Sequence, residues 1–357
     1  MIPARNFHTF YLAAVLALSF QTSFPVLGEQ TVSEMALRWQ RPAGAPRHSD
    51  ICFSIRWMRK NVDPFEKIGM FHGTRFDWVY ATKEFIGQCV QRGYPVSHCT
   101  SPCRSDHGPG EGLYRIGRAE DIHGKPLCAS WQNWSPSWGC YSNPDFFRLL
   151  EQDVLHAVES GAAYMHMDDP DTNQMLRWGG GPKDKETRGC FCRHCLERFR
   201  SRLSRLPANE LKSLGVSDPS IFDYKQLILD GKRNAALRKQ YELSYEKTIR
   251  AFLENLRASA HKRAGRYFPF ACNNGSFTHW EPPIDLFDFA VGELSEYDPP
   301  TPVSIWKKAL NITRMNKAQV FTLRSKDTQE NQKILCLSYC LGMNLGCLAW
   351  RFGATLR

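Results

Sequence analysis

The stretch AYMHMDDPD at residues 163–171 is a short apolar run that ends in three carboxylates. Residues 163–167 favour a β-strand, because the run is short, apolar and free of glycine and proline. The Asp-Asp-Pro-Asp sequence is typical of a turn. In an α/β barrel, active sites are built where buried strands open into loops. We therefore expect residues 163–171 to form a strand of a parallel sheet with a functional carboxylate at its carboxyl end.

Comparable apolar runs recur along the chain, and segments with apolar residues three and four apart separate them. We expect eight strands, at residues 51–57, 76–81, 94–99, 163–167, 267–272, 287–291, 319–323 and 345–350. The helical segments include residues 83–92, 144–160, 224–264 and 329–341. Repeated strand-then-helix units predict an α/β fold with parallel strands, and eight units fit a (β/α)₈ TIM barrel. A doubly wound open sheet is the alternative, but no glycine-rich phosphate turn follows the first strand.

Two long segments interrupt this alternation, at residues 100–143 and 171–190. The first is rich in Pro, Gly, Ser, His and Trp, and the second is polar and contains three consecutive glycines. In a barrel, both would lie over the carboxyl ends of the strands. The sequence stops at Arg357, soon after the eighth expected strand. We therefore expect a barrel that is incomplete at its C-terminus, or a shortened version of a longer chain.

The first 28 residues are expected to be a signal peptide. Arg5 gives a positive start, residues 10–20 are an apolar run too short to span a bilayer comfortably, and small residues precede a cleavage point near Gly28. We expect residues 29–357 to form the barrel domain and to be secreted or periplasmic, without stable membrane insertion after cleavage. A lipid-anchored or uncleaved membrane form is the alternative.

The formal net charge is +10 at pH 7. The basic residues between positions 183 and 266 look spread around helices, and no nucleic-acid-binding module is present. We therefore expect no nucleic-acid partner, and assign the excess charge to attraction by an acidic polysaccharide or another anionic surface. No pattern indicates an oligomeric state.

Three thiols lie within six residues, at Cys190, Cys192 and Cys195. This spacing lets each thiolate reach one ion at about 2.3 Å, as in tetrahedral zinc sites. Cys140 is the best placed fourth ligand, because it precedes the helical segment that leads back to the carboxylate strand. The alternatives are disulfides or buried free thiols. Thirteen cysteines minus four leaves nine, so at least one further thiol stays unpaired.

Two acidic centres follow predicted strands. Asp168 and Asp169 follow the fourth strand, and because side chains alternate along a strand only one of them faces the barrel axis. Glu293 and Glu296 follow the sixth strand, and Glu293 is nearer to its end. Two carboxylates that converge from different strands are what glycosidic bond cleavage needs: one protonates the leaving oxygen while the other attacks the anomeric carbon or activates water. A carbohydrate is therefore the expected substrate.

Other side chains near the expected strand ends suit sugar binding. An aromatic wall for a sugar ring is available in the long loops, and cations and amides for its hydroxyl groups follow several strands. The candidates for substrate binding are Arg56, His98, Trp134, His166, Asn273 and Lys326. Tryptophans also anchor loops by packing, and that alternative stays open for each contact.

A family resemblance rests on the stretch CYSNPDFF at residues 140–147, on the Cys-x-Cys-x-x-Cys sequence at 190–195, and on Phe199-Arg200. These residues resemble the zinc-bearing β-galactosidases of glycoside hydrolase family 42. The resemblance implies a structural zinc held by four cysteines beside the active site, and it supports Cys140 as the fourth ligand.

The sequence departs from that family at the catalytic positions. Family 42 carries an Asn-Glu pair after its fourth strand and a glutamate on its seventh, whereas residues 168–170 here are Asp-Asp-Pro and residues 324–326 are Arg-Ser-Lys. β-Galactosidase activity is therefore not implied. The acid pattern is more similar to α-galactosidases and α-fucosidases, which implies Asp169 as nucleophile with Asp168 second, and Glu293 as acid/base with Glu296 second.

Two other functions remain as alternatives at this stage. One is a carbohydrate-binding barrel without turnover, favoured by the short C-terminus and by the missing glutamate of the seventh strand. The other is a metal-dependent hydrolase with His166, an aspartate of the fourth strand and His98 on a catalytic ion.

Overall fold

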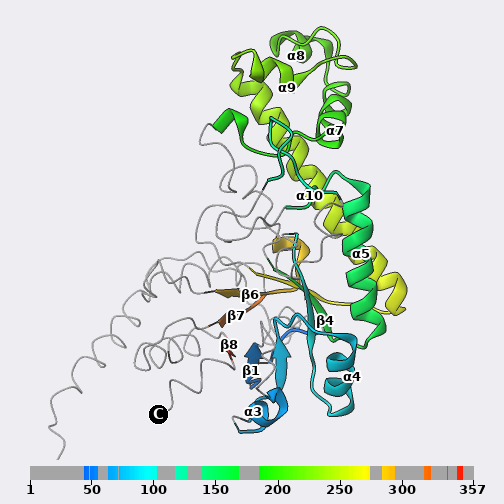
Figure 1. Ribbon diagram of the computed structural model, residues 1–357, viewed down its shortest axis with the longest axis vertical. Helices are drawn as coiled ribbons and strands as arrows, with labels where there is room; N and C mark the ends of the chain where they lie inside the picture. The colour runs from blue at the N-terminus through cyan, green and yellow to red at the C-terminus, as the bar shows by residue number, and fades with distance from the viewer. Residues whose placement is uncertain are drawn as a thin grey trace, which may run out of the picture. The chain divides into compact units, whose positions relative to one another are not determined.

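Eight parallel strands form a single sheet in the computed structural model (Figure 1). The order of the strands is β2-β1-β8-β7-β6-β5-β4-β3, and each neighbouring pair is parallel. Their bounds are β1 Cys52–Ser54, β2 Arg75–Asp77, β3 Ser97–Thr100, β4 Tyr164–Met167, β5 Phe270–Cys272, β6 Phe289–Glu293, β7 Ala318–Thr322 and β8 Asn344–Leu348. Every expected strand has a counterpart, so the prediction of a parallel α/β sheet is confirmed.

The structure describes residues 44–47, 49–54, 63–70, 72–102, 117–127, 138–168, 185–273, 284–293, 317–322, 336 and 344–348. All of them belong to one compact unit that spans residues 41–357. The expected signal peptide at residues 1–28 lies outside the described residues, as does most of the helix expected at 329–341. No helix among the described residues is long and apolar enough to cross a membrane.

The strands at the two ends of the sheet order, β2 and β3, also contact each other. Phe76 and Val96 form an isolated parallel bridge. The backbone N–H of Phe76 donates to the carbonyl oxygen of Pro95 at 2.9 Å, and that of Cys99 donates to the carbonyl oxygen of Val79 at 2.8 Å. Backbone hydrogen bonds therefore join the strands that would be the two edges of an open sheet.

Helices follow the strands as the sequence predicts. The bounds are α3 Pro64–Met70, α4 Lys83–Gln91, α5 Pro144–Glu159, α7 Arg193–Leu203, α8 Ala208–Ser213, α9 Tyr224–Leu229 and α10 Ala235–Ala264, with short 3₁₀ helices η3 Lys185–Thr187 and η4 Ile284–Leu286. The side chain of Asn143 caps α5 and that of Asn234 caps α10. The helix expected at residues 224–264 is two helices, because the chain turns at Gly231 with a φ of +75°.

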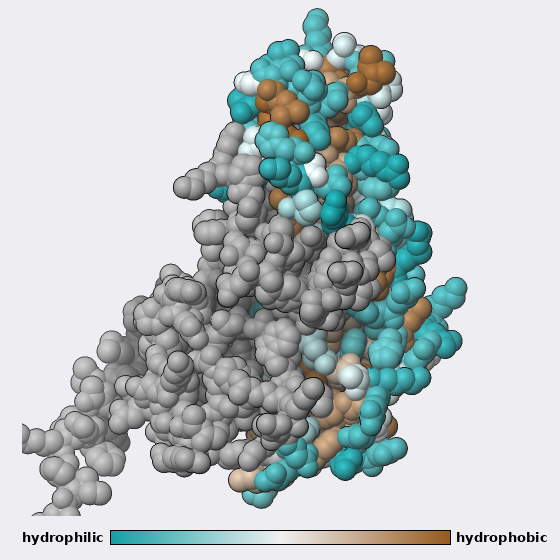
Figure 2. All heavy atoms as spheres, viewed as in Figure 1, coloured by the Kyte–Doolittle hydropathy of each residue, from teal (hydrophilic) through white to brown (hydrophobic). Residues whose placement is uncertain are grey.

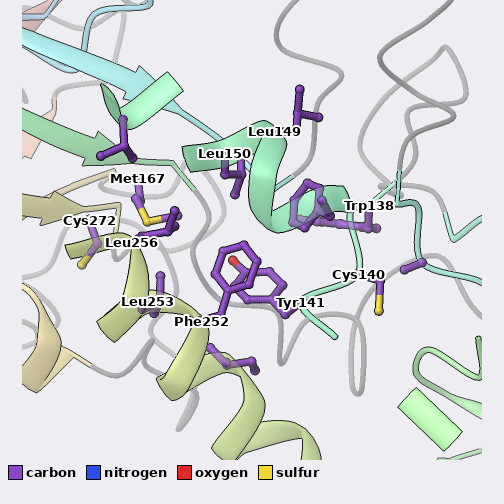
Figure 3. Packing of buried hydrophobic residues seen from close by; sticks show 14 of the residues in the cluster. Trp138, Cys140, Tyr141, Leu149, Leu150, Met167, Phe252, Leu253, Leu256 and Cys272 are labelled. Atoms are coloured by element: carbon purple, nitrogen blue, oxygen red, sulfur yellow. The ribbon is translucent and has the colours of Figure 1, made fainter. Parts of the chain in front are cut away.

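Side chains alternate between the two faces of the sheet. One face, here called the inner face, carries an apolar cluster that includes Trp78, Tyr164, Phe289 and Val291. The opposite face packs against the helices. Figure 3 shows this second cluster, in which Met167 and Cys272 of the strands meet Leu149 and Leu150 of α5 and Phe252, Leu253 and Leu256 of α10. Because the helices cover one face, only the strand residues that alternate to the inner face remain available for a functional site.

Candidate active site and cysteine cluster

Asp168 directly follows β4 and is fully buried. Its Oδ2 accepts a hydrogen bond from the Tyr80 hydroxyl at 2.7 Å, and its Oδ1 accepts one from Nδ2 of Asn273 at 2.8 Å. Its backbone N–H donates to the carbonyl oxygen of Thr100 at 2.8 Å. Residues at the ends of three other strands therefore hold Asp168 in place. Tyr80, which follows β2, and Asn273, which follows β5, bind its carboxylate, and Thr100, which ends β3, binds its backbone N–H.

Asp168 continues the inner-face series of β4. Tyr164 belongs to the inner cluster, and the ring of His166 lies 5.2 Å from that of Trp78, another member of the cluster. Met165 and Met167 belong to the opposite cluster. Alternation thus gives Asp168 an inner position. Asp169 lies outside the described residues, and its expected role as nucleophile stays a prediction.

Tyr80 was not among the residues expected at the site. The chain reaches this position through Trp78, which has a φ of +55°. Asp77 contacts Tyr164 on the inner face, Trp78 also packs there, and Val79 returns to the helix-covered face. Two consecutive residues thus face inward, and the next inward residue is Tyr80. The available signal was a tyrosine near the end of a predicted strand, but its partner could not be read from the sequence.

Glu293 is the last residue of β6 and pairs in register with Thr322 of β7. Phe289 and Val291 belong to the inner cluster, and Ala290 belongs to the opposite one. As the last residue of β6, Glu293 lies at the same end of the sheet as Asp168, and its expected role as acid/base stays a prediction. The strand between them is β5, because the sheet order runs β6-β5-β4.

The amino ends of the strands carry a separate charged network. The Arg75 guanidinium donates to both carboxylate oxygens of Asp77, and the Tyr164 hydroxyl donates to Asp77 as well. Burial, with a smaller contribution from the charge of Asp77, raises the pKa of Tyr164 well above its ordinary value. Arg75 begins β2 and Tyr164 begins β4, and Asp77 lies at the end of the three-residue strand β2, whereas Asp168 follows the carboxyl end of β4. We therefore treat this network as structural, in line with the general division between the two ends of barrel strands.

His98 does not lie with the other candidates. Its ring is 5.5 Å from that of His156 on α5, on the face of the sheet that the helices cover. The expectation that His98 binds substrate or a catalytic ion is therefore corrected, because alternation in β3 turns Cys99 to the inner face and His98 to the other one. His166 and Asn273 do lie on the Asp168 side. Five further candidates lie outside the described residues: Arg56, Trp134, Glu296, Lys326 and Asp169.

The four expected thiols come together in one group. The Sγ atoms of Cys140, Cys190, Cys192 and Cys195 all lie within 4.8 Å of one another, and all four residues are buried. Sγ of Cys140 is 3.4 Å from that of Cys195 and 3.5 Å from that of Cys192. This group can hold a metal ion. In the described part of the chain, it is the only such group of histidine, cysteine or acidic residues.

The cluster joins the starts of two helices. Cys140 lies three residues before the cap of α5, Cys192 is the cap residue of α7, and Cys195 lies in the first turn of α7. Hydrogen bonds from the other three thiols, that of Cys140 first, lower the pKa of Cys192 far below its ordinary value. Burial raises the pKa of Cys190. The site thus favours at least one thiolate, which is the form that ligates metals.

The long helix α10 supports this cluster from its first half. The Tyr241 hydroxyl donates to the carbonyl oxygen of Cys190. Nη1 of Arg238 donates to the carbonyl oxygens of Glu186 and Arg188, at 3.1 and 2.8 Å. The backbone N–H of Phe191 donates to the carbonyl oxygen of Glu120 at 2.7 Å. The cysteine cluster therefore ties the segments that follow β3 and β4 to one helix.

No protein-family model and no curated protein sequence matches this chain. Several solved structures match its fold. The glycoside hydrolase domain of PgaB (BpsB) from Bordetella bronchiseptica matches with a TM-score of 0.53 and 11% identity, over 86% of this chain and 96% of that chain. An exo-β-agarase gives a TM-score of 0.50 and 9% identity, over 80% of this chain and 40% of that chain.

A third match, the α-L-fucosidase isoenzyme 2 of Paenibacillus thiaminolyticus, has a TM-score of 0.49 and 12% identity, over 85% of this chain and 46% of that chain. Identities this low show the fold alone. The match to the PgaB (BpsB) domain, together with the eight parallel strands, carries the conclusion that the chain has a glycoside hydrolase-like fold of the TIM-barrel kind. The resemblance to family 42 stays a prediction, because no family model matches.

Proposed function

We propose that this protein is a glycoside hydrolase whose carboxylate pair is Asp168 and Glu293. The observation that carries the proposal is the place of Asp168: it is buried at the carboxyl end of β4, on the inner face, with one hydrogen-bond donor on each oxygen. A carboxylate fixed in this way is oriented for attack, and orientation lowers the barrier of a nucleophilic step.

In this proposal Asp168 attacks the anomeric carbon and Glu293 protonates the leaving oxygen. Adjacent strands are about 4.8 Å apart, so the backbones of β4 and β6 are roughly 10 Å apart. Side chains that reach inward from both strands can bring the carboxyl groups to about 5 Å, the separation of a retaining glycosidase, or leave them near 7 Å, that of an inverting one. Asp169 and Glu296 are the second candidates for these two roles.

The sheet is proposed to be a closed (β/α)₈ barrel. The Phe76–Val96 bridge and the two hydrogen bonds beside it support closure, because they connect the first and last strands of the sheet order. Closure would bring the ends of β2, β3, β4 and β5 around one mouth, where Tyr80, His166 and Asn273 can contact a sugar. Arg56, Trp134 and Lys326 are further proposed substrate contacts.

The cysteine cluster is proposed to hold a structural zinc ion. Four thiolates at about 2.3 Å from a tetrahedral ion have sulfur atoms about 3.8 Å apart. The distances of 3.4 and 3.5 Å, and the 4.8 Å limit for the whole group, fit this geometry. Four sulfur ligands also leave no open position, as in structural rather than catalytic sites.

The protein is also proposed to be exported by the signal peptide at residues 1–28 and to be secreted or periplasmic.

The test compares Asp168→Asn with Asp169→Asn in hydrolysis of a broad panel of aryl glycosides and oligosaccharides. The two variants remove the same charge from adjacent residues, so each is the control for the other. We expect Asp168→Asn to lower kcat/KM at least about 10³-fold and Asp169→Asn to change it little, because only the inner carboxylate reaches the sugar.

The opposite pattern would move the nucleophile to Asp169. A folded wild-type protein that binds glycans in calorimetry but hydrolyses none would contradict the enzyme proposal and indicate a carbohydrate-binding barrel.

A further inference from the structure

A basic pocket is lined by residues of α7, of the turn after it and of α10. Figure 1 shows these two helices, which follow β4 in the chain. The volume of the pocket is about 540 Å³. Four cations line it: Arg198, Arg202, Arg205 and Lys247. In Figure 2, hydrophilic residues cover much of the visible surface of the described helices, so an anion can approach from water.

These four cations lack acidic partners. No carboxylate among the described residues lies within 4.0 Å of any of them. Arg202 donates two hydrogen bonds to Oε1 of Gln240, at 2.9 and 2.7 Å, and this neutral partner orients the guanidinium without neutralising it. By contrast, the four arginines of α10 each pair with a carboxylate: Arg238 with Glu242, Arg250 with Asp285, Arg257 with Asp288 and Arg263 with Glu159.

The arginines of the pocket repel one another, and this repulsion lowers the stability of α7. Arg198 and Arg202 are four residues apart on α7, and Arg205 lies just beyond the end of this helix. Like charges four residues apart destabilise a helix by about 0.2–0.5 kcal/mol. The place of Arg202 in the last turn offsets part of this repulsion, because cations are favourable near a helix C-terminus. A bound anion would offset the repulsion among all the cations of the pocket.

Hydroxyl groups complete the wall on the side of α10. Ser244 and Thr248 are buried, and both line the pocket. The Thr248 hydroxyl donates to the carbonyl oxygen of Ser244 at 2.9 Å, so the guanidinium groups, the Lys247 ammonium group and the Ser244 hydroxyl are the donors for an anion. Guanidinium groups bind the oxygens of sulfate, phosphate or carboxylate with two parallel hydrogen bonds. No aromatic side chain is among the described residues that line the pocket, so the stacking platform that single-stranded nucleic acids need is missing from this part of the chain.

We propose that this pocket binds a sulfate or carboxylate group of an acidic polysaccharide, at a place separate from the Asp168 site. The oxyanion part of the proposal rests on the four unpaired cations, and the choice of a glycan as its carrier rests on the proposed function. The pocket would then hold one charged unit of a polymer while another part of it lies at the sheet.

The experiment is calorimetry with a sulfated heparin hexasaccharide and its desulfated counterpart. The test variant is Arg198→Ala with Lys247→Ala, which removes two exposed cations of the pocket. The control variant is Arg200→Ala with Lys239→Ala, which removes one cation from each of the same two helices outside the pocket. We expect the test variant to bind the sulfated sugar at least about tenfold more weakly, and the control to stay within about twofold of wild type.

Equal losses in the two variants would overturn the proposal, because they would indicate attraction to net charge. Equal binding of the desulfated sugar with the same dependence on Arg198 and Lys247 would support the proposal through the carboxylate groups of the sugar, whereas equal binding without that dependence would overturn it. Tighter binding of phosphatidylserine vesicles or of single-stranded DNA, with the same dependence on Arg198 and Lys247, would overturn the glycan assignment. Binding is measured without turnover, so a failure here is distinct from a failure of the proposed hydrolase activity.

Discussion

The backbone of Trp78 decides which side chain reaches Asp168. A non-glycine residue with a φ of +55° is held there at a cost of about 1–3 kcal/mol. The Trp78 ring is fully buried and lies beside that of His166, and this packing can offset the strain. The result is a break in alternation that turns Tyr80 inward, where its hydroxyl binds the carboxylate.

The hydroxyl of Tyr80 is predicted to orient the nucleophile. Tyr80→Phe should lower kcat about tenfold with a smaller change in KM, because the hydrogen bond from this hydroxyl to Oδ2 of Asp168 is lost, at about 1–2 kcal/mol. Steady-state kinetics on a substrate found in the panel measures this. Tyr94→Phe is the matched control, since that ring packs against Phe76 at 5.6 Å, away from Asp168. Unchanged kcat in a folded Tyr80→Phe variant would contradict the role.

At the scale of the element, α10 connects features that are far apart in the sequence. Its first half binds the carbonyl oxygen of Cys190 through Tyr241. Further along, the ring of Phe252 lies 4.4 Å from that of Tyr141. Near its end, Ser259 donates to a carboxylate oxygen of Glu151 on α5. One helix of 30 residues therefore supports the cysteine cluster and covers the sheet.

Removing one thiol of the cluster should remove the metal. Cys192→Ser is expected to lower the zinc content from about one ion per chain to near zero, because hard oxygen replaces a soft ligand at a site that needs four. It should also lower the melting temperature, since metal binding is coupled to folding. Elemental analysis and thermal unfolding of the purified protein measure both effects.

Cys89→Ser is the control for that substitution. Cys89 is a buried thiol of α4, and burial raises its pKa to about 12, so it offers no thiolate near neutral pH. This variant should keep its zinc while losing some stability. Wild-type zinc content in Cys192→Ser would show that the cluster holds no zinc.

At the scale of the whole molecule, closure of the sheet predicts slow hydrogen exchange at the strands that would otherwise be its edges. A closed barrel has no edge strand, so the amide hydrogens of Phe76 and Cys99 should exchange with solvent as slowly as that of Met165, which lies inside the sheet. Hydrogen–deuterium exchange resolved by residue measures this. Exchange at Phe76 and Cys99 that is 10²-fold or more faster than at Met165, roughly the difference between an edge and a core amide, would indicate an open sheet.

Local patterns in the sequence predicted the eight strands, their parallel order and the gathering of Cys140 with the cysteines at 190–195. The strands follow from the periods of 2 and 3.6 residues, and the grouping of Cys190, Cys192 and Cys195 follows from their short spacing. Cys140 was added because it precedes the next helical segment and because of the resemblance to family 42. The same patterns could not predict the break in the alternation at Trp78, since the sign of one φ angle depends on what the ring packs against.

Tertiary structure alone decided the contacts of Asp168 and of the basic pocket. Tyr80 and Asn273 meet Asp168 across 88 and 105 positions of sequence. Alternation along β3 places His98 beside His156 of α5. The basic residues looked dispersed in the sequence, yet α7 and α10 bring four of them to one cavity. The sequence by itself determined the strands, the helices and the members of the cysteine cluster. Packing between distant elements determined which other side chains meet, because such contacts depend on how the strands and helices assemble.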